Sequence, residues 1–224
     1  MDFNLNLLII QAPVILFALT VHEYCHGLVA KYLGDDTALR QGRLTLNPIA
    51  HLDVLGTILM FVVGFGWAKP VPVNPNNFKN PRKGMLLVAL AGPASNLLMA
   101  IFAGLMIRYF LPNYSQSGTD TPAIVPTLLV IITLTLQYGV ALAVFNMIPI
   151  PPLDGSRVLY GLLPERQAYS YAKFEPYGMM ILFALFVFGG RVFSFVLWYP
   201  VSIITKALSG LGYFQLWQIV TNFT

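Results

Sequence analysis

The sequence predicts an all-α polytopic membrane protein, a bundle of about four to six transmembrane helices with a re-entrant helix and an extended β-like segment. Composition is the first reason, because 57% of the 224 residues are apolar, 10% are charged, and the mean hydropathy is +0.70. A soluble domain carries about 25% charged residues. The second reason is a series of long uncharged runs, and the third is that prolines and glycines separate them.

The first predicted span runs from about Leu5 to Leu33, which is long enough to cross a bilayer at about 1.5 Å per residue. Between residues 3 and 30 its only formal charge is Glu23, and residues 34–36 (Gly-Asp-Asp) end it. No basic flank precedes this run, so we expect it to remain in the protein and not to be removed as a signal peptide.

Residues 54–73 are predicted to form the re-entrant element. The uncharged run from Val54 to Ala68 is short for a full span and contains glycines. The run that follows, Lys69-Pro70-Val71-Pro72-Val73, cannot be helical, and its alternating prolines favour an extended strand with one unpaired edge. Irregular backbone is tolerated at membrane depth only where it is buried in protein or lines a wet cavity. We therefore expect a short helix that enters the membrane and an extended segment that leaves it on the same side.

A charge-free span is expected from Gly84 to Ile107, followed by a polar loop from Arg108 to Thr121. A third full span then covers Pro122 to about Phe145. It breaks over residues 146–155, because three prolines within that stretch cannot continue a helix.

The C-terminal part is expected to add a span from Tyr177 to Tyr199, after a polar amphipathic stretch. Residues 201–224 are predicted to form a last short span or a helix that lies on the membrane surface. We expect one membrane domain over 1–224, with its core at about 5–160 and C-terminal helices at about 177–224.

The basic residues predict an orientation. If residues 54–73 are re-entrant, the segments 31–53, 69–83 and 154–175 share one side of the membrane, and they carry ten of the 13 Lys and Arg residues. The positive-inside rule places that side in the cytoplasm and the N-terminus outside. The net charge of +4 fits this bias better than nucleic-acid binding, since no basic run is interleaved with aromatic residues.

The sequence His22-Glu23-Tyr24-Cys25-His26 lies within the first predicted span. Ionisable groups are costly in hydrocarbon and are read as functional there. Residues four apart share one face of a helix, so His22 and His26 can bind one zinc ion per chain together. Glu23 then lies beside the ion, placed to take a proton from a water that the ion activates. Cys25 is the single cysteine, which excludes a cysteine-based zinc site.

A catalytic zinc needs three protein ligands and one open position. The candidates at membrane depth for the third ligand are Asp154, His51 and Asp53. Asp154 is the best of these, because it follows a long uncharged run and lies just past a proline break that can fold the chain back. Gly155 beside it permits a tight turn. His51 and Asp53 are interpreted as a pair that anchors a loop.

With these motifs the chain resembles the site-2 protease family of intramembrane zinc metalloproteases, of the short prokaryotic type without a PDZ or cystathionine-synthase-type domain. The resemblance covers about residues 15–160 and rests on HEYCH at 22–26, GPASN at 92–96, NMIPIPPLDG at 146–155, LNPIAHLD at 46–53, Gly56-Thr57, and GWAKPVPVN at 66–74. Val54 departs from the family, whose members often have proline there.

The resemblance implies that His22, His26 and Asp154 bind zinc and that Glu23 is the general base. It also implies that Asn96 and Asn146 lie near the substrate or the oxyanion. The extended segment Gly66 to Val73, including Trp67, Val71 and Val73, would pair with an unwound substrate strand. The implied protein cuts membrane-spanning substrates near the cytoplasmic side of a prokaryotic cytoplasmic membrane, as in regulated intramembrane proteolysis.

Two other functions stay open at this stage. A membrane transporter of ions or metals could use the intramembrane His, Glu and Asp residues as a relay, although no internal repeat is visible. An inactive relative could bind membrane helices without cutting them, which the intact set of ligands and base argues against. The substrate, the cleavage site, the trigger and the oligomeric state are not encoded in any motif of this sequence.

Overall fold

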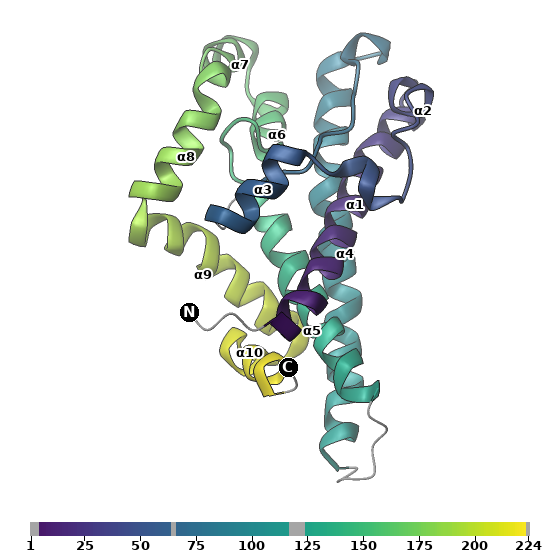
Figure 1. Cartoon of the computed structure of the whole chain (residues 1–224). Coiled ribbons are helices and arrows are strands. Elements are labelled where there is room, and N and C mark those ends of the chain that lie inside the picture. Colours follow the sequence, from purple (N-terminus) through teal and green to yellow (C-terminus); the bar gives the residue numbers. More distant parts are fainter. Residues whose placement is uncertain (1–4, 64–65, 117–123, 223–224) are drawn as a thin grey trace. The chain divides into compact units, whose positions relative to one another are not determined.

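The computed structural model describes residues 5–63, 66–116 and 124–222 (Figure 1). In chain order its helices are α1 (Leu5–Tyr32), α2 (Thr37–Arg40), η1 (Pro48–His51), α3 (Val54–Val63), η2 (Pro75–Asn77), α4 (Pro81–Gln116), α5 (Ile124–Asn146), α6 (Asp154–Leu162), α7 (Glu165–Ala172), η4 (Glu175–Tyr177), α8 (Gly178–Phe188), α9 (Gly190–Ser209) and α10 (Tyr213–Asn222). Elements marked η are short 3-10 helices.

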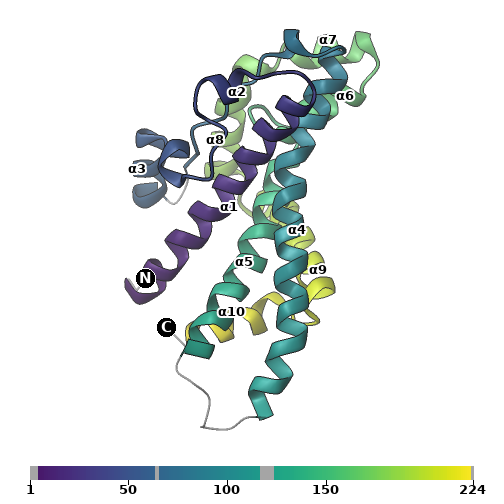
Figure 2. The same ribbon diagram turned by 90° about the vertical axis from the view of Figure 1, so that its right-hand side faces the viewer.

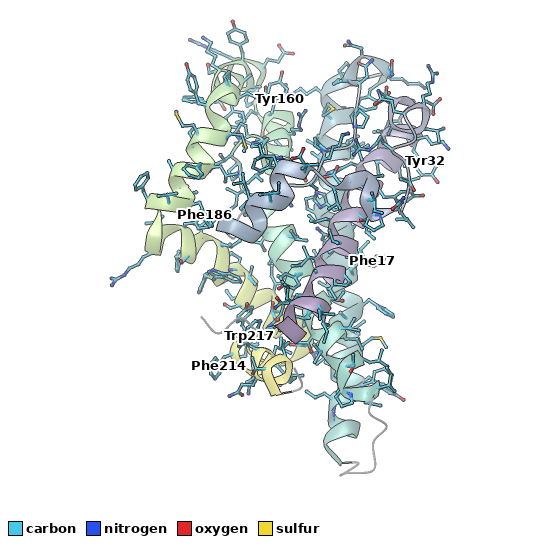
Figure 3. All side chains as sticks on the ribbon, viewed as in Figure 1. Phe17, Tyr32, Tyr160, Phe186, Phe214 and Trp217 are labelled. Atoms are coloured by element: carbon cyan, nitrogen blue, oxygen red, sulfur yellow. The ribbon has the colours of Figure 1, made fainter. Side chains whose placement is uncertain are left out.

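The prediction of an all-α polytopic protein is confirmed. Within the described residues, five helical segments are long and apolar enough to cross a membrane, namely Leu7–Tyr32, Pro81–Pro112, Ile124–Asn146, Glu165–Phe188 and Gly190–Ser209. Many large apolar side chains on the helices are exposed. Phe17 of α1 and Phe214 of α10, both labelled in Figure 3, are more than half exposed. Such surfaces suit helices that face lipid.

The chain divides into two compact units. We call the first the bundle unit; it comprises Met1–Ala18, Asn96–Phe145 and Gly189–Thr224. We call the second the motif unit; it comprises Leu19–Ser95 and Asn146–Phe188. That residues 1–224 act as one membrane domain stays a prediction.

Apolar packing holds the bundle unit together. The second half of α4 runs alongside α5 (Figures 1 and 2), and their buried residues form a cluster with residues of α9 and α10. Small residues allow this close approach: a Cβ added to Gly139 would lie 2.8 Å from the main-chain oxygen of Asn96. A second cluster joins Val14 of α1 to Leu134 of α5 and Val220 of α10.

In the motif unit, the region predicted to be re-entrant begins with the helix α3 and continues as non-helical chain over residues 66–74. An isolated antiparallel bridge between Leu52 and Ala68 is the β-like pairing in the described residues. The predicted order, a short helix and then an extended segment, is therefore found. Whether these residues enter and leave the same face of a membrane stays a prediction.

The polar loop predicted from Arg108 onwards is wrong up to residue 116, because α4 continues to Gln116. The helix can continue past Arg108 because the charged side chain of Arg108 has hydrogen-bond partners within the bundle unit. The Arg108 guanidinium donates from Nε to the main-chain oxygen of Leu208 at 2.7 Å and from Nη2 to that of Ala207 at 2.6 Å, in the last turn of α9. A cation there satisfies carbonyl groups at a helix C-terminus, so it does not need to end its own helix.

The span predicted from Tyr177 to Tyr199 is also wrong, since the chain forms α8 and α9 with a break at Gly189. Gly190, the first residue of α9, has φ +43°, so the helical path of α8 does not continue directly into α9. Residues 201–224 are likewise not one helix. Their first part belongs to α9, which ends before Gly210 at φ +79°, and α10 follows.

Candidate metal centre

The helix α1 places the two histidines of the motif side by side. His22 and His26 are one helical turn apart, and their Nε2 atoms are 3.0 Å from each other. The rings meet edge to face, with centroids 4.6 Å apart. Both residues are buried, at 3% and 8% exposure. Two imidazole nitrogens therefore point at one location inside the motif unit.

Asp154, the first residue of α6, comes to the same location. Its Oδ2 lies 3.0 Å from Nε2 of His22 and 3.3 Å from Nε2 of His26. A tight turn brings it there: a Cβ on Gly155 would lie 2.3 Å from the main-chain oxygen of Met147. Only glycine fits at that position without a shift of the backbone. Proximity of Asp154 to the histidines was the main expectation from sequence, and the structure brings the three side chains together.

The three atoms have the spacing that a tetrahedral zinc requires. Zinc binds nitrogen and oxygen ligands at about 2.0–2.1 Å, which places neighbouring ligand atoms of a tetrahedron about 3.3 Å apart. The mutual distances of 3.0, 3.0 and 3.3 Å are close to that value. Oδ2 of Asp154 is buried and has no hydrogen-bond donor among the described residues, although two ring nitrogens lie beside it. A carboxylate oxygen in such a place fits a cation.

Two further features of the motif unit favour metal binding between these side chains. Nδ1 of His26 donates a hydrogen bond to the main-chain oxygen of Val88 at 2.7 Å, which leaves Nε2 with its lone pair free for a metal. Gly92 of α4 faces the rings: a Cβ there would lie 2.5 Å from Nε2 of His26 and 2.6 Å from Nε2 of His22. The absence of a side chain at Gly92 therefore keeps open the space between the imidazoles.

Glu23 lies next to this cluster on α1. One of its carboxylate oxygens and one ring nitrogen each of His22 and His26 are within 4.8 Å of one another. Glu23 is half-buried, and its Oε2 accepts a hydrogen bond from the main-chain N–H of Val71 at 2.8 Å. A carboxylate in this position can exchange a proton with a group bound between the ligands.

Asp35 holds the non-helical chain that reaches Glu23 by hydrogen bonds, and it was predicted from sequence only to end the first helix. It is fully buried and accepts hydrogen bonds from Thr37, from the main chain of Asn74 at 2.7 Å and from Nδ2 of Asn77 at 2.7 Å. Burial raises the pKa of Asp35, but these hydrogen bonds outweigh it and hold the pKa below its usual value. The Asp-x-Thr spacing at 35–37, typical of a side chain that caps its own turn, could have drawn attention to this residue.

The other two candidates for the third ligand have structural partners. Nε2 of His51 donates to the main-chain oxygen of Thr45 at 2.8 Å, and Oδ1 of Asp53 accepts from the main-chain N–H of Gly56 at 2.8 Å, at the start of α3. These contacts suit the interpretation that both residues anchor the loop before α3.

The remaining candidates from sequence are spread over both units. Asn96 is fully buried in α4 and belongs to the bundle unit, and half-buried Asn146 is the last residue of α5. Half-buried Trp67 has its main-chain oxygen against Gly56 of α3. Val71 is buried, and Val73 packs against the cluster of Ala30, Phe78 and Val88.

Comparison with known proteins identifies the family. A model described as peptidase family M50 matches residues 116–189. Relatives in three bacteria carry the name "Putative zinc metalloprotease". YwhC of Bacillus subtilis is 42% identical over 197 residues, which cover 88% of this chain and 87% of that protein.

Two mycobacterial relatives, both called Rip2, are more distant. The protein of Mycolicibacterium smegmatis is 27% identical over 77% of this chain and 64% of its own length. That of Mycobacterium tuberculosis strain H37Rv is 27% identical over 88% of this chain and 75% of its own length. No solved structure matches.

The comparisons give no support to the transporter that the sequence left open, because the family model and the named relatives all refer to peptidases. The five apolar helical segments of the described part of the chain, together with the family, indicate an integral membrane protein. At the identity and coverage of the Bacillus relative, the chain belongs to peptidase family M50, the site-2 proteases, and is an intramembrane zinc metalloprotease.

Proposed function

We propose that His22, His26 and Asp154 are the three zinc ligands of this protease and that Glu23 is its general base. The observation that carries the proposal is the convergence of two imidazole nitrogens and one carboxylate oxygen at 3.0–3.3 Å from one another in a buried place. One acidic and two neutral ligands leave a fourth position of a tetrahedral ion open, as catalytic zinc sites do.

The chemistry divides between the ion and the chain. When bound, zinc supplies a Lewis acid that polarises the peptide carbonyl and lowers the pKa of water. Glu23 accepts the proton of the attacking water and returns it to the nitrogen of the leaving amine. Nδ1 of His26, held by the main-chain oxygen of Val88, keeps its ring in one orientation through both proton transfers. Gly92 leaves room for the reacting groups.

The substrate is a membrane-spanning protein or peptide whose helix unwinds near the site. A helix hides its amide groups in its own hydrogen bonds, so a cleavable bond needs an extended stretch and a surface that accepts it. The extended segment around Trp67, Val71 and Val73 is the surface we assign to this stretch, because it lies beside Glu23. Asn96 and Asn146 are the polar side chains we assign to the substrate or the oxyanion.

The reactive centre opens to the cytoplasm of a bacterial cell in this proposal, and the N-terminus lies outside. The support is the charge bias: ten of the 13 Lys and Arg residues lie in the motif unit, which also holds the cluster of His22, His26 and Asp154. Basic residues collect on the cytoplasmic side of membrane proteins.

The test is cleavage of a single-span substrate by the purified protein in bicelles, with zinc content measured in parallel. Glu23→Gln should lower the cleavage rate by about 10²- to 10⁴-fold and keep one zinc per chain, since it removes only the base. Asp154→Ala should lose both zinc and activity. A Glu23→Gln protein that cleaves at the wild-type rate would refute the assignment of the base. An Asp154→Ala protein with full zinc would refute that of the third ligand.

A further inference from the structure

Glu23 contacts the main chain of the extended segment, residues 66–74. Its Oε2 accepts the N–H of Val71 at 2.8 Å. The Val71 side chain is 8% exposed and lies over α1, where a Cβ added to Gly27 would be 3.1 Å from Cγ1 of Val71. Gly27 is four residues after Glu23 and shares its helix face. Both the main chain and the side chain of Val71 are thus directed at the part of α1 that carries Glu23.

The residues on either side of Val71 have no main-chain N–H that could take the place of the Val71 donor. Val71 lies between Pro70 and Pro72, and proline has no N–H. Within residues 70–72, Val71 is therefore the one main-chain donor that the chemistry of the chain provides. A donor in the main chain holds its charge and position independently of pH and of side-chain rotamers.

Hydrogen bonds fix the segment on both sides of Val71. Before it, the Lys69 N–H donates to the main-chain oxygen of His51 at 2.9 Å, and the Lys69 oxygen accepts from Nη2 of Arg43 at 2.9 Å. After it, the Asn74 N–H donates to Oδ2 of Asp35 at 2.7 Å. Because the chain is tied down at residues 69 and 74, the direction of the Val71 N–H is set by its surroundings in the motif unit.

We propose that the main-chain N–H of Val71 is a positioning group for the Glu23 carboxylate and holds it in the rotamer in which it exchanges protons at the metal centre. The inference rests on the proposed function, in which Glu23 is the base. It gives the main-chain N–H of Val71 a different task from pairing with the substrate, since the N–H that orients Glu23 is not available to a substrate carbonyl; the rest of Val71 stays part of the surface assigned to the substrate. The extended segment then sets the geometry of the base at one edge and meets the substrate elsewhere.

The sharpest test replaces the amide of Val71 by an ester, through site-specific incorporation of the α-hydroxy analogue of valine. This change removes the N–H and keeps the side chain and the flanking prolines. We expect kcat for a single-span substrate to fall by about 10- to 100-fold, the usual loss when a group that orients a functional side chain is removed. KM and a zinc content of one per chain should not change. Val71→Pro, which also removes the N–H, should have the same effect.

A matched ester at Asn74 controls for the loss of a main-chain hydrogen bond to a carboxylate. It removes the donor to Asp35, while Asn77 still ties the segment to Asp35 at 2.7 Å. This protein should melt at a lower temperature and lose clearly less kcat than the Val71 ester, because the Val71 N–H itself is kept. If both esters reduced kcat equally, the effect would come from a loosened segment and the proposal would be overturned.

A second readout is independent of turnover. In zinc-depleted protein labelled with ¹⁵N-valine, the amide proton of Val71 should resonate downfield and move upfield in Glu23→Ala. A Val71 amide proton with the same chemical shift in the wild type and in Glu23→Ala would overturn the proposal. So would an ester protein in which KM rises with kcat unchanged, because the N–H would then serve the substrate. Failure of the proposed function has a different signature, namely a Glu23→Gln protein that still cleaves.

Discussion

The two units of the protein bury different kinds of side chain. Among the described residues, every buried ionisable side chain (His22, His26, Asp35 and His51) lies in the motif unit. The buried polar residues of the bundle unit, such as Thr133 and Gln137, are neutral, and its two clusters are apolar. In the motif unit, directed polar contacts act beside an apolar cluster of Ala30, Phe78 and Val88, whereas the bundle unit relies mainly on close packing of apolar and small residues.

Substitutions should therefore act differently in the two units. Polar networks that are fully satisfied specify one arrangement, and they fail when a single partner is lost. Apolar helix packing loses stability in proportion to the volume removed and tolerates change better. Substitutions in the motif unit should therefore change zinc content and catalysis, and substitutions in the bundle unit should change stability.

Gly92→Ala should have the largest effect on zinc binding and cleavage. The new Cβ would lie 2.5 Å from Nε2 of His26 and 2.6 Å from Nε2 of His22, so the imidazoles must move apart or turn. We expect zinc affinity to fall by about 10- to 100-fold or more, with a parallel loss of cleavage. Zinc titration with a competing chelator measures this directly.

Gly84→Ala is the control for Gly92→Ala. It lies in the same helix and the same unit, and its Cβ would lie 2.3 Å from Cδ2 of Phe78, but it does not face the histidines. It should lower stability and keep zinc affinity. Equal zinc affinities in Gly92→Ala and Gly84→Ala would show that the missing side chain of Gly92 does not matter specifically for the metal site.

In the bundle unit, Leu136→Ala should lower the free energy of unfolding by about 2 to 5 kcal/mol, because Leu136 is fully buried in the cluster of α4, α5, α9 and α10. Unfolding in mixed micelles with increasing SDS measures the loss. Leu128→Ala on the same helix is the control, since Leu128 is exposed, and it should cost little. The folded fraction of Leu136→Ala should still bind zinc. If its zinc affinity fell as far as that of Gly92→Ala, the two units would not respond separately.

Asp35→Asn should have the smallest of the three effects, about 1 to 3 kcal/mol, since an amide replaces an acceptor of several charge-assisted hydrogen bonds. The lowered pKa of Asp35 predicts the pH dependence. A carboxyl group with a depressed pKa stabilises the folded state above its unfolded pKa of about 3.9 and loses this contribution as the pH falls through its folded pKa. The difference in unfolding free energy between wild type and Asp35→Asn should be constant at neutral pH and shrink below about pH 4.

Asp36→Asn is the neighbouring control for Asp35→Asn, because the Asp36 side chain makes no capping hydrogen bond to α2. Its stability should follow that of the wild type at every pH. A gap between wild type and Asp35→Asn that widened on acidification would contradict the assigned direction of the pKa.

The sequence allowed the membrane class, the first three spans and the convergence of His22, His26 and Asp154 to be predicted. Helical periodicity fixes the relation of the two histidines, and the scarcity of charge at membrane depth leaves few partners for them. The break at Gly189 could not be predicted, since two adjacent glycines can sit within a lipid-exposed helix or end it. The length of α4 was missed because the partners of Arg108 lie about 100 residues away in sequence, at Ala207 and Leu208.

Other parts of the site could not be read from residue types. In the sequence, Gly92 was only the first residue of the GPASN motif, and the structure shows that its missing side chain is next to both imidazoles. The contact between Glu23 and the N–H of Val71 involves a main-chain group, which every residue except proline carries and no motif reports. Main-chain contacts of this kind depend on how the chain folds, and residue types alone do not indicate them.

X-ray absorption at the zinc edge of the purified protein tests the assigned zinc ligands without relying on activity. Coordination by His22, His26 and Asp154 predicts nitrogen and oxygen neighbours only, at about 2.0–2.1 Å, with the multiple-scattering pattern of two imidazoles. Asp154→Ala should abolish this spectrum. A sulfur neighbour at about 2.3 Å, which would implicate Cys25, or an unchanged zinc environment in Asp154→Ala would contradict the account.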